Sequence, residues 1–162
     1  LIIEEDYRSS KNNHLKRFLS PINQSINFKF NKFFRQITKN KNKTLKMLEI
    51  KGRKINIENF YERVMKFNFD ELCNRNLGSE DYIAIANNCD FIFIKDLPDF
   101  NEDNSNQQQR FITLIDIIYE KQIPLMISSK ISLDRINSSK NLIEPFKRTV
   151  SRLYELTSMD YN

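Results

Sequence analysis

The chain has 162 residues, 40% hydrophobic and 29% charged, so one compact domain or two very small ones is expected. Its only two glycines, Gly52 and Gly78, are too far apart for a phosphate-binding loop, which needs at least two glycines within about six residues. The single histidine, His14, excludes a pair of histidine zinc ligands, and Cys73 and Cys89 do not form a C-x-x-C pair. The sequence therefore contains no P-loop, no dinucleotide fingerprint and no common zinc motif, and we predict no metal site in it.

Charge is distributed unevenly along the chain. Residues 1–66 hold 16 Lys and Arg against 6 Asp and Glu, whereas residues 67–162 hold 10 against 15. We therefore expect a basic N-terminal segment over 1–66 and an α/β region over 67–162. Both cysteines have apolar neighbours, so we expect buried free thiols in a reducing compartment. No apolar run approaches the ~20 residues that cross a bilayer, and we expect a cytoplasmic protein.

The first predicted elements are an amphipathic helix and a β-hairpin. Four phenylalanines between residues 28 and 34 alternate with basic residues, and a lysine-rich loop follows over 39–43. Near-helical spacing favours core packing for these rings, although bases could also stack on such aromatics while lysines pair with phosphates. Alternating residues around Gly52 predict a small antiparallel hairpin over 45–57, with a third strand near 64–69.

The second half predicts a β-α-β unit. Residues 79–88 resemble a helix capped by Ser79, and 91–96 form an apolar run typical of a strand buried on both faces. A capping box of Ser105 and Gln108 would then open a helix. The buried face of that helix would carry Phe111, Leu114, Ile115 and Ile118. A second apolar strand over 124–129 completes the unit, whose two strands must run parallel. The fold class is therefore mixed α/β with flanking helices.

Polar residues follow both predicted parallel strands. Asp96, Ser128 and Ser129 would lie at the carboxyl ends of these strands, where open parallel sheets bind ligands. Asp96 is thus a candidate to lie beside a bound phosphate or to bind a water molecule of a metal ion. The simpler interpretation, which we favour, is that Asp96 caps the turn before Pro98.

The last predicted helix begins near Pro145, because the fixed φ of proline suits a first helical position. Arg148 and Arg152 are four residues apart and share one face, with Glu155 a turn beyond. Two guanidinium groups on one face can bind a polyphosphate, and they can equally form surface ion pairs. From the residues alone the ion pairs are the favoured interpretation.

Several short motifs stand in a defined order along the chain. They are Asp6-Tyr7-Arg8, Phe69-Asp70-Glu71-Leu72-Cys73, Asp81-Tyr82-Ile83-Ala84, Asp96-Leu97-Pro98, Arg110-Phe111-Ile112 with Leu114, Asp116 and Tyr119, Ser128-Ser129, and Arg148-Thr149-Val150-Ser151-Arg152-Leu153 with Glu155, Ser158 and Tyr161. In this order and spacing they resemble the C-terminal half of the ZapE family of AAA+ P-loop ATPases, also called AFG-one-like.

The resemblance implies an ATP-hydrolysing motor, with ATP and Mg²⁺ as cofactors of the full-length parent. The Walker A and Walker B residues would precede Leu1. The 162 residues of this chain would then be a fragment that has no catalytic residue and is inactive alone. The implied partners are the missing P-loop core, further copies in a homo-oligomer, and a client protein. That client would be an FtsZ-type division protein or a membrane protein under quality control. The resemblance therefore allows a second location for the parent protein, at the periphery of the inner membrane, besides the cytoplasm.

The sequence departs from the family pattern at two places. The family usually has two arginines before the phenylalanine of the central helix, whereas Gln109 precedes Arg110 here. Where the family has Asp-Glu, this chain has Asp116 followed by Ile117. The resemblance therefore makes Arg110 a candidate for an ion pair or a subunit contact. For Arg148 and Arg152 it leaves two roles open, a phosphate or subunit contact and a structural salt bridge.

A rival hypothesis needs no parent enzyme. A freestanding module could use the basic half to bind nucleic acid or an acidic protein, and such binding would weaken steeply as salt rises.

Overall fold

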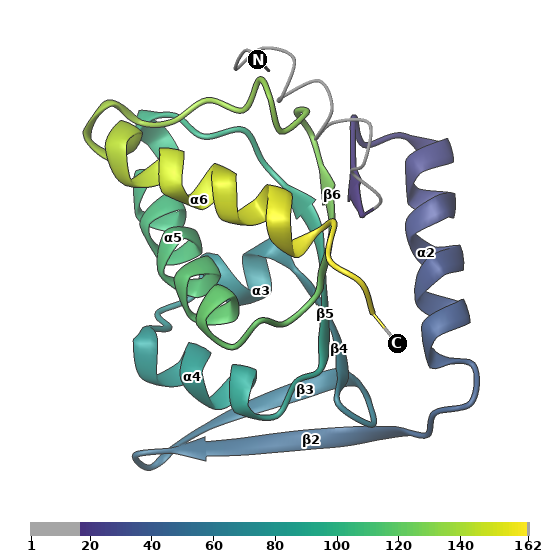
Figure 1. The fold of residues 1–162 in the computed structure, drawn as a ribbon. Helices are drawn as coiled ribbons and strands as arrows, with labels where there is room; N and C mark the ends of the chain where they lie inside the picture. The colour runs from purple at the N-terminus through teal and green to yellow at the C-terminus, as the bar shows by residue number, and fades with distance from the viewer. Residues whose placement is uncertain (1–16, 162) are drawn as a thin grey trace.

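The computed structural model describes residues 17–161, which form one six-stranded mixed sheet with helices on both faces (Figure 1). The strand order across the sheet is β1, β6, β5, β4, β3, β2. The strands are β1 Phe18–Leu19, β2 Lys43–Ile50, β3 Arg53–Tyr61, β4 Val64–Asn68, β5 Phe91–Leu97 and β6 Leu125–Ser129. Strands β1, β6, β5 and β4 run parallel, and β3 and β2 are antiparallel to their neighbours. The predicted mixed α/β class is confirmed.

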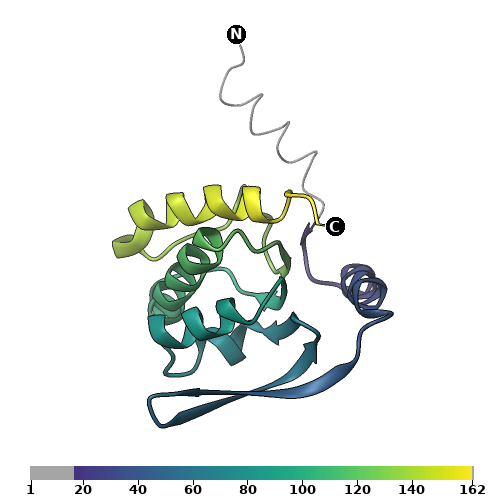
Figure 2. The same cartoon turned by 60° about the horizontal axis from the view of Figure 1, so that its bottom comes forward.

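The helices lie on the two faces of the sheet unequally (Figures 1 and 2). One face is covered by α2 alone, and the other by α3, α4, α5 and α6. Their bounds are α2 Gln24–Thr38, α3 Phe69–Cys73, α4 Ser79–Asn87, α5 Ser105–Glu120 and α6 Ile143–Leu156, with short 3-10 turns at Glu102–Asn104 and Lys140–Leu142. Among these helices, none is both long enough and apolar enough to cross a membrane.

The period of two along the central strands divides the core between the two faces. Alternate residues such as Phe91 and Phe93 pack against Phe30 and Phe34 of α2. The intervening residues of β5, including Ile92, join the larger cluster that lies under α3 to α6. Because both faces are covered, the first four residues of β5, Phe91 to Ile94, are all apolar and buried, as expected for a parallel strand in a sheet centre.

The hairpin of β2 and β3 forms as predicted. Lys51 and Gly52 both have positive φ, at 48° and 80°, which is the conformation that a tight two-residue hairpin turn requires. Two ion pairs hold the turn against α4. The Arg53 guanidinium lies 2.9 Å from the Asp81 carboxylate, and the Lys51 ammonium lies 2.6 Å from Glu80.

The β-α-β unit of β5, α5 and β6 is confirmed. The two strands are parallel neighbours, with Phe93 opposite Met126 and Ile94 opposite Ile127. The face of α5 expected to be buried is in the core, through Phe111, Leu114, Ile115 and Ile118. Both thiols are free and buried, also as predicted.

Two predicted helix caps are wrong, and a third helix begins slightly before the predicted residue. Gly78, not Ser79, is the N-cap of α4, and its N–H donates to the Asp81 carboxylate at 2.8 Å. The capping box of Ser105 and Gln108 does not form, because a 3-10 turn with its own asparagine contacts precedes α5. Helix α6 begins at Ile143, two residues before Pro145, because another 3-10 turn leads into it. The Asp6-Tyr7-Arg8 motif and His14 lie outside the described residues.

Candidate functional site

The two arginines of α6 meet one carboxylate of α5. Arg148 Nη2 lies 3.3 Å from Asp116 Oδ2, and Arg152 Nη1 donates to the other oxygen, Oδ1. The Arg152 guanidinium also lies over the ring of Tyr119, 4.6 Å from its centroid. Asp116 and Tyr119 are three residues apart, so they share one face of α5. The site therefore consists of two basic side chains on one helix bound to an acidic and an aromatic side chain on the next.

The two arginines differ in how exposed their guanidinium groups are to a ligand. The Arg152 side chain is 21% exposed, since it is held between Asp116 and Tyr119, whereas the Arg148 side chain is 54% exposed. A guanidinium has five N–H donors, and the described contacts of Arg148 use one of them, on Asp116. Arg152 is suited to hold α6 on α5, and Arg148 retains donors for an external anion.

The structure does not bring Arg110 to this cluster. Its Nη1 donates to the carbonyl oxygen of Cys73 at 3.1 Å, at the C-terminal end of α3. That carbonyl belongs to the last turn of a helix, which attracts cations. Arg110 therefore ties α5 to α3, and the three predicted arginines form two separate groups.

The carboxyl ends of β5 and β6 bring Asp96 and Ser128 together, as expected. The register between the two strands breaks between Ile94 and Leu97, and Asp96 there has a positive φ of 63°. Its backbone N–H donates to Ser128 Oγ at 3.0 Å, while its side chain is exposed. Ser129 Oγ donates to the Ile131 carbonyl at 2.7 Å. Both hydroxyls are thus engaged in shaping the strand ends.

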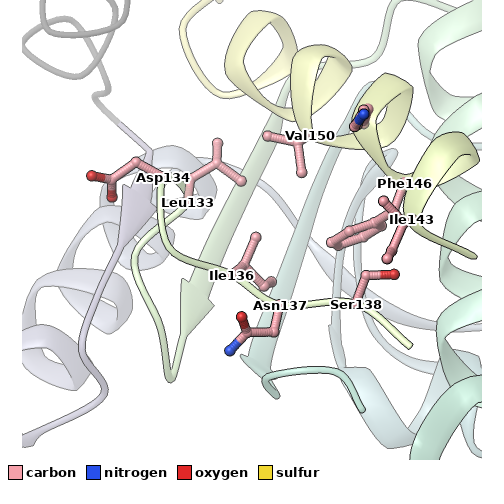
Figure 3. Close-up of a pocket in the computed structure, with 9 residues that line it drawn as sticks. Leu133, Asp134, Ile136, Asn137, Ser138, Ile143, Phe146 and Val150 are labelled. Carbon is pink, nitrogen blue, oxygen red and sulfur yellow. The ribbon is translucent and has the colours of Figure 1, made fainter. Parts of the chain in front are cut away.

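A cavity of about 390 Å³ opens beside α6 (Figure 3). Ile143, Phe146 and Val150 of α6 line one side, and the loop after β6 lines the other. Buried Gln108 holds this loop, since its Nε2 donates to Ser138 Oγ at 2.7 Å and its Oε1 accepts the Ser139 N–H at 3.0 Å. From its sequence neighbours Gln108 is predicted to cap a helix, and this role in holding the loop cannot be read locally, because the loop partners lie 30 and 31 residues away in sequence.

The aromatic residues of α2 belong to the core, as favoured above. Phe30 and Phe34 are buried, and Phe33 packs against Phe91 and Phe93. Phe28 is the exposed ring of the four. A row of free aromatic faces for stacking bases is therefore absent from α2.

Arg17 is a buried cation that the sequence analysis did not single out. Its Nε donates to the Leu125 carbonyl at 3.1 Å, and its Nη2 donates to the carbonyls of Leu156 and Met159 at 2.9 and 2.6 Å. Burial lowers the pKa of this guanidinium below its ordinary value. Because Leu156 is the last residue of α6, Arg17 joins the end of that helix to the sheet.

The two thiols are not suited to nucleophilic chemistry. Burial raises the pKa of Cys73 well above its ordinary value and that of Cys89 to about 12, so both stay protonated near neutral pH. Within residues 17–161, no three His, Cys, Asp or Glu side chains converge as a metal ion would require.

Comparison with known proteins places the chain in a family. The sequence profile described as AFG1-like ATPase matches residues 3–162. Cell division protein ZapE of Escherichia coli K12 is 26% identical over 156 residues, which cover 96% of this chain and 42% of that protein. Lactation elevated protein 1 homolog B of Danio rerio is 26% identical over 148 residues, covering 72% of this chain and 29% of that protein. The chain thus spans less than half the length of these relatives, and no solved structure matches it. Since the profile match extends over nearly all of its residues, the chain belongs to the AFG1-like ATPase family.

Proposed function

We propose that these residues form the C-terminal region of a AAA+ P-loop ATPase whose nucleotide-binding loops lie outside this chain. The observation that carries the proposal is a family match over nearly the whole chain, in a sequence with no glycine-rich loop. The two glycines serve other purposes, since Gly52 forms the hairpin turn and the Gly78 N–H donates to Asp81. Neither belongs to a cradle for a triphosphate, so we assign no step of hydrolysis to the described residues.

The parent protein would hydrolyse ATP and use the released energy to remodel a protein client. Mg²⁺ bound with ATP would offset the phosphate charge, and both would be held by the parent's core. The name of the Escherichia coli relative supports a client in cell division. Protein quality control at a membrane is the other setting that the family resemblance suggests. The 162 residues alone would be inactive.

Within such an assembly, the cluster of Asp116, Arg148 and Arg152 would have two tasks. Arg152, held between Asp116 and Tyr119, would fix the position of α6 on α5. Arg148, with most of its donors unused by the described contacts, would bind a phosphate or a carboxylate of a neighbouring subunit in a homo-oligomer. Arg110 would support the site indirectly, through its contact with α3.

The test is ATP turnover and assembly of the parent protein carrying Arg148→Ala, Arg152→Ala or both. We expect Arg148→Ala to lower turnover or assembly without lowering thermal stability much, and Arg152→Ala to lower stability as well. Lys147→Ala is the matched control, because Lys147 lies on the same helix and its described ion pair is with Glu144, in the preceding turn. Turnover and assembly equal to the parent's in the double variant would contradict a functional role for both arginines.

A further inference from the structure

Strand β2 is the outer strand of the sheet, and its free edge pairs with no other strand in residues 17–161 (Figures 1 and 2). Leu48 points inward and is buried with the core. The opposite face carries Lys43, Leu45, Met47 and Glu49, all exposed. Leu45 is 65% exposed and Met47 is 50% exposed. This is an eight-residue edge with two large apolar side chains in water.

The backbone of β2 is suitable for pairing with another strand. Proteins usually blunt an exposed edge with a very short strand, charged side chains, a proline or a bulge, because its free N–H and C=O groups recruit other strands. β2 carries two lysines, Lys43 and Lys46, but it is eight residues long and contains no proline. The register between β2 and β3 shifts where Thr44 faces Phe60 and Lys46 faces Ile57, which places the extra residue on β3. The free edge of β2 is therefore regular along its length.

We propose that two copies of this chain associate through their β2 edges, antiparallel, with Lys46 on the two-fold axis. In that register Lys43 of each copy faces Glu49 of the other, and Leu45 faces Met47. The exposed face would thus gain two Lys–Glu pairs and two Leu–Met pairs across the new strand contact. Opposite charges and apolar side chains directly across an antiparallel pair are both stabilising. The same surface serves both partners, as a closed two-fold contact requires.

Neighbouring registers do not match in this way. Side chains directly opposite in an antiparallel pair lie on the same face, so the register can shift only by an even step. One shift places Lys43 opposite Met47, and the shift in the other direction places Leu45 opposite Glu49. Each sets a charge against an apolar side chain. The sequence of β2 therefore selects one register for self-pairing.

The axis itself carries one unfavourable contact, between the two copies of Lys46. This side chain is on the inner face, where its Nζ lies over the ring of Phe60 in its own chain, 5.7 Å from the centroid. Its charge is thus partly directed away from the axis. We expect two paired edge strands to bury less than the roughly 1,200 Å² of a standard interface, so the association should be weak and should depend on concentration.

Charge reversal on the full 162-residue chain tests the contact, with sedimentation equilibrium as the measurement. Lys43→Glu and Glu49→Lys each place like charges opposite each other twice, and we expect each to raise the dimer dissociation constant about tenfold or more. The combined variant Lys43→Glu with Glu49→Lys restores both pairs and should recover dimerisation. Lys39→Glu makes the same charge change in an exposed position outside β2 and should have little effect. A monomer at all concentrations, or a combined variant no tighter than the single ones, would overturn the proposal.

A cross-link tests the register. Residues opposite each other in an antiparallel pair have Cα atoms roughly 4.5–5.5 Å apart, which a disulfide can span. Lys46→Cys should therefore form a covalent dimer on mild oxidation, whereas Lys39→Cys at equal concentration should not. The native thiols are buried and do not compete. Equal cross-linking of the two variants would refute the register. The edge contact does not depend on the ATPase assignment, and neither experiment requires nucleotide.

Discussion

Asp116→Asn is the most informative single substitution in the candidate site. It removes the charge that binds both Arg148 and Arg152 while keeping the shape of the side chain and a similar helix propensity. It also leaves two guanidinium groups on one face of α6 with no carboxylate between them. We expect the variant to be folded and less stable than the parent sequence.

The magnitude follows from how exposed each partner is. A hydrogen bond to a charged group contributes about 1.5–3 kcal/mol when dry, and an exposed ion pair about 0.2–1 kcal/mol. Asp116 is 32% exposed and Arg152 is 21% exposed, so we assign about 1 kcal/mol to their contact. The more exposed Arg148 adds about 0.3 kcal/mol, and repulsion between the arginines costs about 0.3 kcal/mol. The total is about 1.6 kcal/mol, which corresponds to a melting temperature lower by about 3–6 °C.

A double-mutant cycle measures the interaction itself. Urea unfolding of Asp116→Asn, Arg152→Met and the combined variant should give a coupling energy of about 1 kcal/mol. The same cycle with Arg148→Met should give about 0.3 kcal/mol. Glu144→Gln, in an exposed pair on α6, should change stability by less than about 0.3 kcal/mol. A coupling energy near zero for Arg152, or a larger one for Arg148, would refute the reasoning.

Two further predictions concern buried groups. Folding raises the pKa of Cys73, and it raises the pKa of Cys89 to about 12. As pH rises, the unfolded chain therefore loses its thiol protons before the folded chain does. The free energy of unfolding should then fall above about pH 8.5, the usual pKa of a thiol. Urea unfolding between pH 7 and 10 measures how the free energy of unfolding depends on pH, and Cys89→Ala should reduce this dependence. An unchanged dependence would contradict a contribution from the buried Cys89 thiol. Gln108→Ala leaves the buried Ser139 N–H without its acceptor and should cost about 1–3 kcal/mol. Limited proteolysis should then cut the loop after β6 faster, and a cleavage rate equal to the parent's would show that Gln108 does not hold the loop.

The sequence predicts those helices and strands whose pattern lies in neighbouring residues. The apolar run of β5, the apolar face of α5 and the turn at Gly52 all depend on residues close together in sequence. The strand β1 was not predicted, because its two residues form a strand only through pairing with β6, more than 100 residues away. The short α3 was missed as well, since five residues carry little periodicity. The division into segments 1–66 and 67–162 stays a prediction.

The helix starts and the candidate site show where local patterns are insufficient. Ser105 and Gln108 match a capping box, yet a 3-10 turn precedes α5, and Gln108 is hydrogen-bonded to the loop after β6 instead. The shared face of Arg148 and Arg152 was predicted, but their partner Asp116 lies 32 and 36 residues away on another helix. The family resemblance makes Arg110 a third candidate, but its contact with the Cys73 carbonyl at the end of α3 separates it from the other two. Contacts between elements, unlike the elements themselves, depend on the packing of the whole domain.

The claim that the catalytic loops lie outside this chain is tested most directly by ATP turnover. The purified 162-residue chain and the longer parent protein should be assayed side by side, with Mg²⁺ and at equal molar concentration. We expect steady turnover by the parent and only background by the chain, at every chain concentration. Hydrolysis that rises in proportion to the concentration of the chain alone would contradict the claim.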